Sequence, residues 1–365
     1  MESMNKILVI NPFGIGDVLF TTPLLRNLKN FFPGSRIAFM CGERVAPILE
    51  NNPHIDEVIA FNRGDFKRYY KQGKLAAIKI LWQIVLKLKR YKFNLCFDLS
   101  LEHRYSLLLK LLGVKMRIGY DFKGRGRFLT HKIELDEYKD KHVAEYHLEL
   151  LSFLNLEPRP ERLEFFLSSK QKEWAQDFLS LKGVKGSDIL IAIAPFGGEA
   201  FGEQFEIKQW PAENFASLCN ILCERYRAKI VIIAGSKEKN ALDSFMDLLY
   251  NKDVIDTSSN SLIEAASIIS SCSIMVANDT GPLRFADALG VSSVALFGPT
   301  DDKVYGFYPP DSRNIAVKKE FPCRPCYRKF RLSGCNYNRR CLRGISVDEV
   351  LEAVEKLLAK GKENG

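Results

Sequence analysis

The chain has 365 residues and a mass of 41.6 kDa; 46% of its residues are hydrophobic and 27% are charged. These proportions are typical of a globular protein and exclude bulk disorder and fibrous repeats. At roughly 150 residues per domain the length predicts two domains. The sequence has no run of about 18 apolar residues, which excludes an obvious membrane-spanning helix.

The net charge of +9 is concentrated in two windows. Residues 63–92 hold ten Lys or Arg and one acid, and residues 318–343 hold nine and one. The two windows together carry +17, so the remainder of the chain carries −8. Any basic surface is therefore expected to be local.

The nine cysteines do not form the framework of a small disulfide-rich protein at this length. Five of them lie in apolar segments and are interpreted as small buried hydrophobes. The N-terminus passes directly into a strand pattern, without a basic-then-apolar leader. These features predict a reducing, cytoplasmic location.

The first half of the chain alternates apolar strand patterns with helical patterns. Such alternation predicts a parallel α/β sheet with helices on both faces. The helix after the first Gly-rich turn is expected over residues 21–32, with Pro23 in its first turn. The expected strands are 6–10, 36–40, 57–61, 95–99 and 116–119.

The second half repeats this pattern, and we place the boundary near Leu167. The prediction is a domain of residues 1–167 and a domain of residues 168–365. Four strands of the second half end in loops of small or polar residues, where ligands bind in open α/β sheets. The expected elements are a helix at 170–181, strands at 188–194, 229–234, 273–277 and 291–297, a Cys-rich segment at 318–343 and a final helix at 346–360.

The Gly-rich turn after the first strand contains Gly14, Gly16 and Asp17. The glycines allow backbone N–H groups to approach a ligand, and the following helix presents its positive end. A carboxylate at position 17 can accept a proton from a substrate hydroxyl. The alternative is that Asp17 only caps the helix.

A second polar loop, Asn278-Asp279-Thr280-Gly281-Pro282-Leu283-Arg284, opens a helix expected over residues 283–289. Its N–H groups and helix N-terminus would suit a diphosphate, and Asp279 could bind sugar hydroxyls. Lys208, just before Trp210-Pro211, could face the same phosphates. The alternatives are a plain capped helix start and a solvated lysine.

Taken together, these segments resemble the ADP-heptose:lipopolysaccharide heptosyltransferase family, glycosyltransferase family 9. The resemblance lies in Gly14-Ile-Gly-Asp-Val-Leu-Phe-Thr-Thr-Pro23, Lys208-Gln-Trp-Pro211, Asn278-Asp-Thr-Gly-Pro282, Ala288 to Thr300 and the tail from Cys323 to Ser346. It covers nearly the whole chain in order. It implies a GT-B fold, in which two Rossmann-like parallel-sheet domains face a central cleft. The N-terminal domain would bind the acceptor and the C-terminal domain the nucleotide sugar.

The resemblance also implies roles for single residues. Asp17 would be the general base, Lys208 would contact the diphosphate, and Asp279 would bind the sugar. Thr280, Gly281 and Pro282 would supply phosphate-contacting backbone, and Glu238 would face the nucleotide ribose. Where many members of the family have a histidine, this chain has Arg284, whose charge still suits a phosphate.

The implied activity is an inverting, metal-independent transfer of heptose from ADP-heptose to a lipopolysaccharide core acceptor of the lipid A–Kdo type. No cofactor is required beyond the nucleotide-sugar substrate. Two alternatives stay open: a transferase of this fold that uses another nucleotide sugar, and a non-catalytic relative that binds nucleotide or lipid.

Four cysteines, Cys323, Cys326, Cys335 and Cys341, have a spacing that suits a structural zinc ion. The second pair is wider than the usual CxxC spacing. Four reduced cysteines are an equally good interpretation.

Residues 75–90 form an amphipathic, basic-edged pattern that suits either an interfacial helix on anionic lipid or a core-packed helix. Since the implied acceptor is a phosphorylated lipid, Arg63, Lys67 and Arg68 are predicted to bind it, together with Gly14 and Gly16. The predicted location is the cytoplasmic face of the inner membrane. No nucleic-acid-binding motif accompanies the charge.

Overall fold

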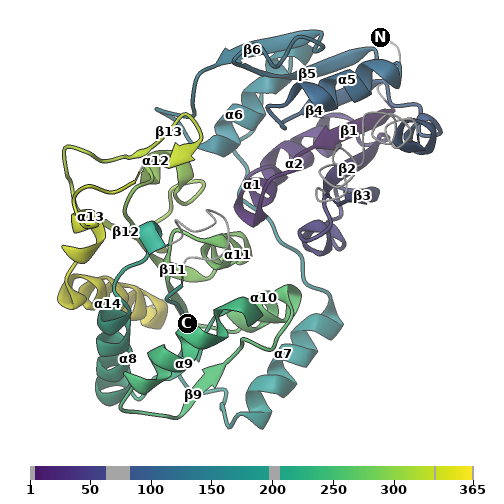
Figure 1. Ribbon diagram of the computed structural model, residues 1–365. Helices are drawn as coiled ribbons and strands as arrows, with labels where there is room; N and C mark the ends of the chain where they lie inside the picture. Colours follow the sequence, from purple (N-terminus) through teal and green to yellow (C-terminus); the bar gives the residue numbers. More distant parts are fainter. Residues whose placement is uncertain (1–4, 63–82, 197–205, 333, 364–365) are drawn as a thin grey trace. The chain divides into compact units, whose positions relative to one another are not determined.

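The computed structural model describes residues 5–62, 83–196, 206–332 and 334–363. By internal contacts the chain divides into two compact units, Met1–Phe166 and Leu167–Gly365. Each unit contains a six-stranded sheet in which every pair of neighbouring strands is parallel (Figure 1). The predicted parallel α/β architecture is confirmed.

The sheet of the first unit has the strand order β3-β2-β1-β4-β5-β6. The chain enters at the central strand β1, builds one side of the sheet, and then crosses to β4 on the other side of β1. The crossing point lies between the carboxyl ends of β1 and β4, which is where ligands bind in folds of this type. The strands are β1 (Lys6–Ile10), β2 (Arg36–Gly42), β3 (Glu57–Phe61), β4 (Leu95–Asp98), β5 (Met116–Phe122) and β6 (His131–Leu135).

The second sheet repeats the same winding, with the order β12-β11-β10-β7-β8-β9. Its central strand β7 is entered first, and its crossing point lies between β7 and β10. The strands are β7 (Leu190–Ala194), β8 (Lys229–Ile232), β9 (Val254–Asp256), β10 (Ile274–Asn278), β11 (Ser292–Phe297) and β12 (Asn314–Lys318).

The central strands are buried on both faces. Every residue of β7 and of β10 is buried, as is every residue of β1 after Lys6. Continuous runs of branched apolar residues form such strands because helices cover both sides of a parallel sheet. The helices of the first unit are α1 (Ile15–Leu19), α2 (Thr22–Phe31), α5 (His103–Leu111) and α6 (Val143–Glu149), with shorter turns at Ala46–Leu49 and Leu150–Leu154.

In the second unit the last helix, α14, packs beside α8, and both contribute to one core with β7, β8 and β10 (Figure 1). The C-terminal segment is therefore an integral part of this unit. Its helices are α7 (Ser169–Leu181), α8 (Ala212–Tyr226), α9 (Lys239–Asp247), α10 (Leu262–Ser270), α11 (Gly281–Leu289), α12 (Asp302–Tyr305), α13 (Arg340–Arg343) and α14 (Val347–Glu363), with a turn at Ser236–Glu238 and a hairpin of β13 (Tyr327–Arg328) and β14 (Arg331–Leu332).

The helix predicted over residues 21–32 is confirmed as α2, and a separate short helix, α1, which was not predicted, precedes it. The break follows from Pro23, which has no N–H to donate to the carbonyl of Leu19. The hydroxyl of Thr22 donates to that carbonyl instead, at 2.7 Å. The loop containing Asp17 thus forms a short helix of its own.

The sequence analysis missed the short hairpin strands β13 and β14 and three strands of the two large sheets, β6, β9 and β12, each at an edge of its sheet. An edge strand pairs with a neighbour on one side only and is less completely covered than a central strand, so its sequence needs no continuous apolar run. In β6, partly buried and exposed residues alternate from His131 to Glu134 and only Leu135 is buried, and in β12 every residue is only partly buried. In the part of the chain that the structure describes, no helix is long and apolar enough to span a bilayer.

Candidate functional site

Asp17 lies in α1, in the connection that leaves the carboxyl end of β1. Its side chain accepts a hydrogen bond from the backbone N–H of Gly14, with 3.2 Å between Gly14 N and Asp17 Oδ2. Its own carbonyl accepts from Asn11 Nδ2 and Thr21 Oγ1, both at 2.9 Å. The carboxylate is thus fixed at the N-terminus of α1, where the partial positive charge favours an anion.

This capping bond does not decide between the two interpretations of Asp17. The bond involves Oδ2 as an acceptor, which is compatible with a helix cap and with a general base alike. The two neighbouring glycines differ in position, since Gly14 precedes α1 as its N-cap and Gly16 lies within the helix.

Two buried titratable groups support this region from inside the first unit. His147 lies 3.2 Å from the carbonyl of Phe20 through Nδ1, and 3.5 Å from Thr21 Oγ1. A carbonyl only accepts, so Nδ1 is assigned the proton; burial lowers the pKa of His147 to about 4, which keeps the ring neutral. Asp98, at the end of β4, is buried, and burial raises its pKa to about 6.

The residues predicted to bind acceptor phosphates, Arg63, Lys67 and Arg68, lie outside the described residues. Of the basic pattern at 75–90, the structure describes a helical stretch at 83–89. Val85 and Leu88 are buried there in the core of the first unit. This part of the segment is therefore core-packed, with Lys87 and Lys89 exposed at its edge.

In the second unit, Lys208, Asp279 and Arg284 meet in one buried ionic cluster. Lys208 Nζ lies 2.7 Å from Asp279 Oδ2, and Arg284 Nη2 binds Asp279 Oδ1. The side chains of Lys208 and Asp279 are each 8% exposed, and that of Arg284 is 3% exposed. Two cations therefore bind one carboxylate near the N-terminus of α11.

Thr300 is the fourth member of this cluster and was not predicted. Its hydroxyl donates to Asp279 Oδ2 at 2.7 Å. It comes from the loop after β11, the strand next to β10. The available signal was the small, polar loop Gly298-Pro299-Thr300 at a strand end.

The electrostatics of Asp279 are those of a carboxylate held as an anion. Burial by itself would raise its pKa, but the charges of Lys208 and Arg284, with the hydrogen bonds from Lys208 and Thr300, hold the pKa well below its usual range. The buried charge is thus stable only as part of the cluster.

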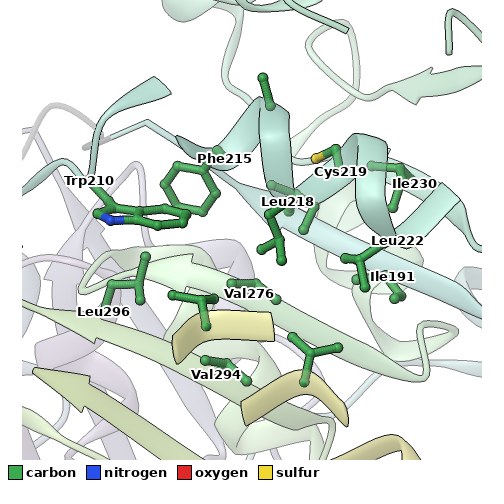
Figure 2. Packing of buried hydrophobic residues seen from close by; sticks show 14 of the residues in the cluster. Ile191, Trp210, Phe215, Leu218, Cys219, Leu222, Ile230, Val276, Val294 and Leu296 are labelled. Carbon is green, nitrogen blue, oxygen red and sulfur yellow. The ribbon is translucent and has the colours of Figure 1, made fainter. Parts of the chain in front are cut away.

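The residue before Asp279 places Lys208. Asn278 Oδ1 accepts from the backbone N–H of Trp210 at 2.9 Å, and its Nδ2 donates to the carbonyl of Pro195 at 2.9 Å. Trp210 is 1% exposed, and its indole N–H donates to the carbonyl of Ile345 at 2.9 Å. Figure 2 shows Trp210 beside Phe215, whose ring lies edge-on to it at a centroid distance of 4.9 Å.

Two adjacent residues at the end of β10 therefore hold two residues of the segment before α8. Asn278 binds Trp210 and Asp279 binds Lys208. Since the Trp210 ring is locked in the core, the ammonium group two residues earlier has little freedom.

The other predicted donor residues lie at two strand ends. Thr280 is the N-cap of α11 and its hydroxyl donates to the carbonyl of Asn278 at 3.2 Å; Gly281 and Pro282 form the first turn of the helix. Glu238 follows β8, and its side chain accepts from Gly235 N at 2.8 Å. That bond gives Glu238 a local capping role, and a contact with ribose stays a prediction.

The four clustered cysteines line one small cavity of the second unit, together with Pro299 and Phe321. Burial, with the neighbouring thiols of Cys323, Cys341 and Cys335, raises the pKa of Cys326 to about 11. Cys326 Sγ donates to the carbonyl of Cys323 at 3.1 Å, and Cys335 Sγ accepts from Arg339 N at 3.2 Å. Among the described residues, no three His, Cys, Asp or Glu side chains are arranged to hold a metal ion.

The ionic cluster yields a stability prediction. Asp279→Asn removes the counter-charge that Asp279 supplies to the buried Lys208 and Arg284, so we expect the free energy of unfolding of the second unit to fall by about 3–5 kcal/mol. Urea unfolding followed by circular dichroism and tryptophan fluorescence measures this loss.

The matched control is Glu352→Gln, which breaks the exposed pair of Glu352 with Lys356 on α14. Exposed pairs contribute little, so this variant should unfold close to the wild type. Equal behaviour of the two variants would contradict the buried ionic cluster.

Comparison with known proteins gives the same assignment from several directions. The model of glycosyltransferase family 9 (heptosyltransferase) matches residues 81–335. The chain is 23% identical over 355 residues to lipopolysaccharide heptosyltransferase 3 of Escherichia coli K12, covering 94% of this chain and 95% of that protein.

Solved structures show the fold. A glycosyltransferase family 9 protein from Veillonella parvula has a TM-score of 0.81 and 24% identity, with 99% of each chain covered. The Escherichia coli ADP-heptose lps heptosyltransferase II has a TM-score of 0.77 and 21% identity, covering 98% of this chain and 99% of the other. The predicted GT-B class of fold is confirmed, and the chain belongs to glycosyltransferase family 9, the heptosyltransferases, and is a glycosyltransferase.

Proposed function

We propose that this chain is a heptosyltransferase of lipopolysaccharide core biosynthesis, which takes heptose from ADP-heptose. The observation that carries the proposal is the cationic cluster of Lys208, Asp279 and Arg284 at the N-terminus of α11. The names of the relatives support the sugar and the acceptor class, since they are lipopolysaccharide heptosyltransferases, one of them an ADP-heptose enzyme.

The donor half of the mechanism follows from charge. When the sugar leaves, negative charge develops on the departing diphosphate. Two buried cations held by one carboxylate, next to a helix N-terminus, stabilise that charge and need no reorganisation to do so. In this proposal Lys208 and Arg284 carry out the charge stabilisation, and Asp279 orients both cations and contacts the sugar.

The acceptor half is assigned to Asp17. Its carboxylate removes the proton from an acceptor hydroxyl, whose oxygen forms the new bond to the anomeric carbon while the bond to the diphosphate breaks on the opposite face. The configuration of that carbon is inverted. Asp17 keeps the Gly14 N–H bond throughout, which holds the carboxylate in one orientation.

We place the enzyme at the cytoplasmic face of the inner membrane, with an anionic lipid-linked saccharide as acceptor. The support is the lipopolysaccharide acceptor named for its relatives and the basic window of the sequence. Arg63, Lys67, Arg68, Gly14 and Gly16 remain the proposed acceptor contacts, and Glu238 the proposed ribose contact.

A donor panel tests the function itself. We expect turnover with ADP-heptose and a lipid A–Kdo acceptor, and none comparable with GDP-, UDP- or dTDP-sugars. Product formation is measured by mass spectrometry of the glycolipid. Preference for another nucleotide sugar would contradict the donor, and binding of nucleotide without any transfer would indicate a non-catalytic relative.

The base is tested by Asp17→Asn. The amide oxygen of Asn still accepts from Gly14 N, so the cap survives while the base is lost. We expect turnover to fall by about 10² or more, with unchanged affinity for ADP. The readouts are initial rates and calorimetric titration.

The control for this variant is Asp188→Asn. Asp188 makes the same local bond, accepting from the backbone N–H three residues earlier, Lys185 N, at 2.8 Å. It should leave turnover unchanged. Near-normal turnover of Asp17→Asn would remove Asp17 from the role.

We also propose that the four clustered cysteines bind one structural zinc ion. The support is their convergence on one cavity and the preference of zinc for four thiolates. The thiols would have to leave their present hydrogen bonds and lose their protons, so the alternative of four reduced cysteines remains a direct competitor.

Metal analysis of protein purified without chelator decides between them. We expect about one zinc per chain, and its loss in Cys326→Ser with Cys323→Ser. The control is Cys272→Ser. Cys272 is buried, follows the end of α10 and is not one of the four clustered cysteines. Wild-type protein without stoichiometric metal would contradict the site.

A further inference from the structure

The loop that supplies Thr300 to the ionic cluster is held by the Cys-rich segment. The backbone carbonyls of three consecutive loop residues, Gly298 to Thr300, accept hydrogen bonds from the Cys-rich segment. Gly298 O accepts from Arg324 Nε at 2.7 Å, and Thr300 O accepts from Arg324 Nη2 at 3.1 Å. Between them, Pro299 O accepts from the backbone N–H groups of Cys326 and Tyr327, at 2.8 and 3.0 Å.

The guanidinium of Arg324 is itself fixed. Its side chain is 4% exposed, and Nη2 also lies 2.9 Å from Asp302 Oδ1. Asp302 is held in turn by Lys318, with 2.8 Å between Lys318 Nζ and Asp302 Oδ2. One planar group thus joins two backbone carbonyls and the carboxylate of Asp302, and its Nη1 also lies 3.5 Å from Glu320 Oε1.

A packing contact with Leu342 also restricts this loop. A Cβ atom at Gly298 would lie 2.7 Å from two side-chain carbons of Leu342 in α13. Such a distance is too short for a carbon contact, so the backbone of the loop already lies directly against Leu342. The loop cannot shift toward α13.

We propose that Arg324 is a positioning residue of the donor site. It sets the backbone at Thr300 so that the hydroxyl points to Asp279 Oδ2, and this bond keeps Asp279 oriented between Lys208 and Arg284. The ligand concerned is a nucleoside diphosphate, and the inference rests on the proposed function in taking the cluster as the donor diphosphate site.

The chemistry requires arginine in particular. The planar fork of a guanidinium donates in several fixed directions at once, whereas an ammonium group is a single point charge. Arg324 uses Nε for Gly298 and Nη2 for Thr300 and Asp302. A lysine at this position would keep the charge and lose the simultaneous bonds.

The test measures binding of ADP to the full chain by calorimetry, with kcat and KM for ADP-heptose. We expect Arg324→Lys to weaken ADP binding and raise KM about tenfold, the scale of one charge-assisted hydrogen bond, with a smaller change in kcat. Thr300→Val should weaken ADP binding similarly, and Thr300→Ser, which keeps the hydroxyl, should bind as the wild type does.

The double variant Arg324→Lys with Thr300→Val shows whether Arg324 affects ADP binding through Thr300 or independently of it. If Arg324 acts through Thr300, Arg324→Lys adds little in a Thr300→Val background. If the two effects multiply, Arg324 does not act through Thr300 and the inference is overturned. Wild-type affinity in Arg324→Lys also overturns it.

The matched control is Arg313→Lys. Arg313 likewise joins a carboxylate and a carbonyl, Asp311 at 2.9 Å and Gly290 O at 3.0 Å, but belongs to the connection before β12. It should bind ADP normally. Should Arg324→Lys fail to fold, as judged by circular dichroism, Asp302→Ala replaces it, since it removes the side-chain acceptor that binds Arg324 Nη2. Normal ADP binding in that variant contradicts the inference. A wild-type chain that binds no ADP would instead contradict the proposed donor.

Discussion

The second unit depends on one constraint, which is that the carboxylate of Asp279 is buried with two cations. A buried charge is costly unless it is paired and hydrogen-bonded with good geometry. The elements that meet this requirement come from three parts of the chain: Lys208 before α8, Arg284 on α11 and Thr300 after β11. The packing of Trp210 and the bonds of Arg324 both fix members of this set. Much of the local structure is therefore explained by the need to hold a single anion.

The two sheets share one winding order, yet they place different chemistry at the same topological position. At the crossing point of the first sheet, a capped carboxylate lies in the connection after β1. At the crossing point of the second, a cationic cluster follows β10. In the proposed mechanism, the carboxylate of the first unit removes the proton, and the cations of the second unit stabilise the leaving diphosphate.

The sequence predicted the buried strands because continuous apolar runs are typical of parallel strands that helices cover on both faces. It did not predict β6, β9 and β12, since an edge strand is defined by its neighbour and not by its composition. The resemblance to a family selected Lys208, Asp279 and Arg284, but not their mutual contacts. Lys208 was expected to face phosphates and Asp279 sugar hydroxyls, while the structure pairs them with each other. Lys208 and Asp279 are 71 residues apart in the sequence, and they meet because Trp210 is buried in the core two residues after Lys208. The sequence pattern alone does not show that Trp210 is buried there.

The bond from the indole of Trp210 to the carbonyl of Ile345 has a consequence for biosynthesis. The first unit contains all six of its strands before residue 136 and can fold while the ribosome is still translating. The second unit cannot close its core until α14 is available, because Val350, Val354 and Leu357 pack with Trp210, Phe215 and Ile345. A nascent chain can therefore complete its first sheet early, and it completes the core of the second unit only after α14 has been translated.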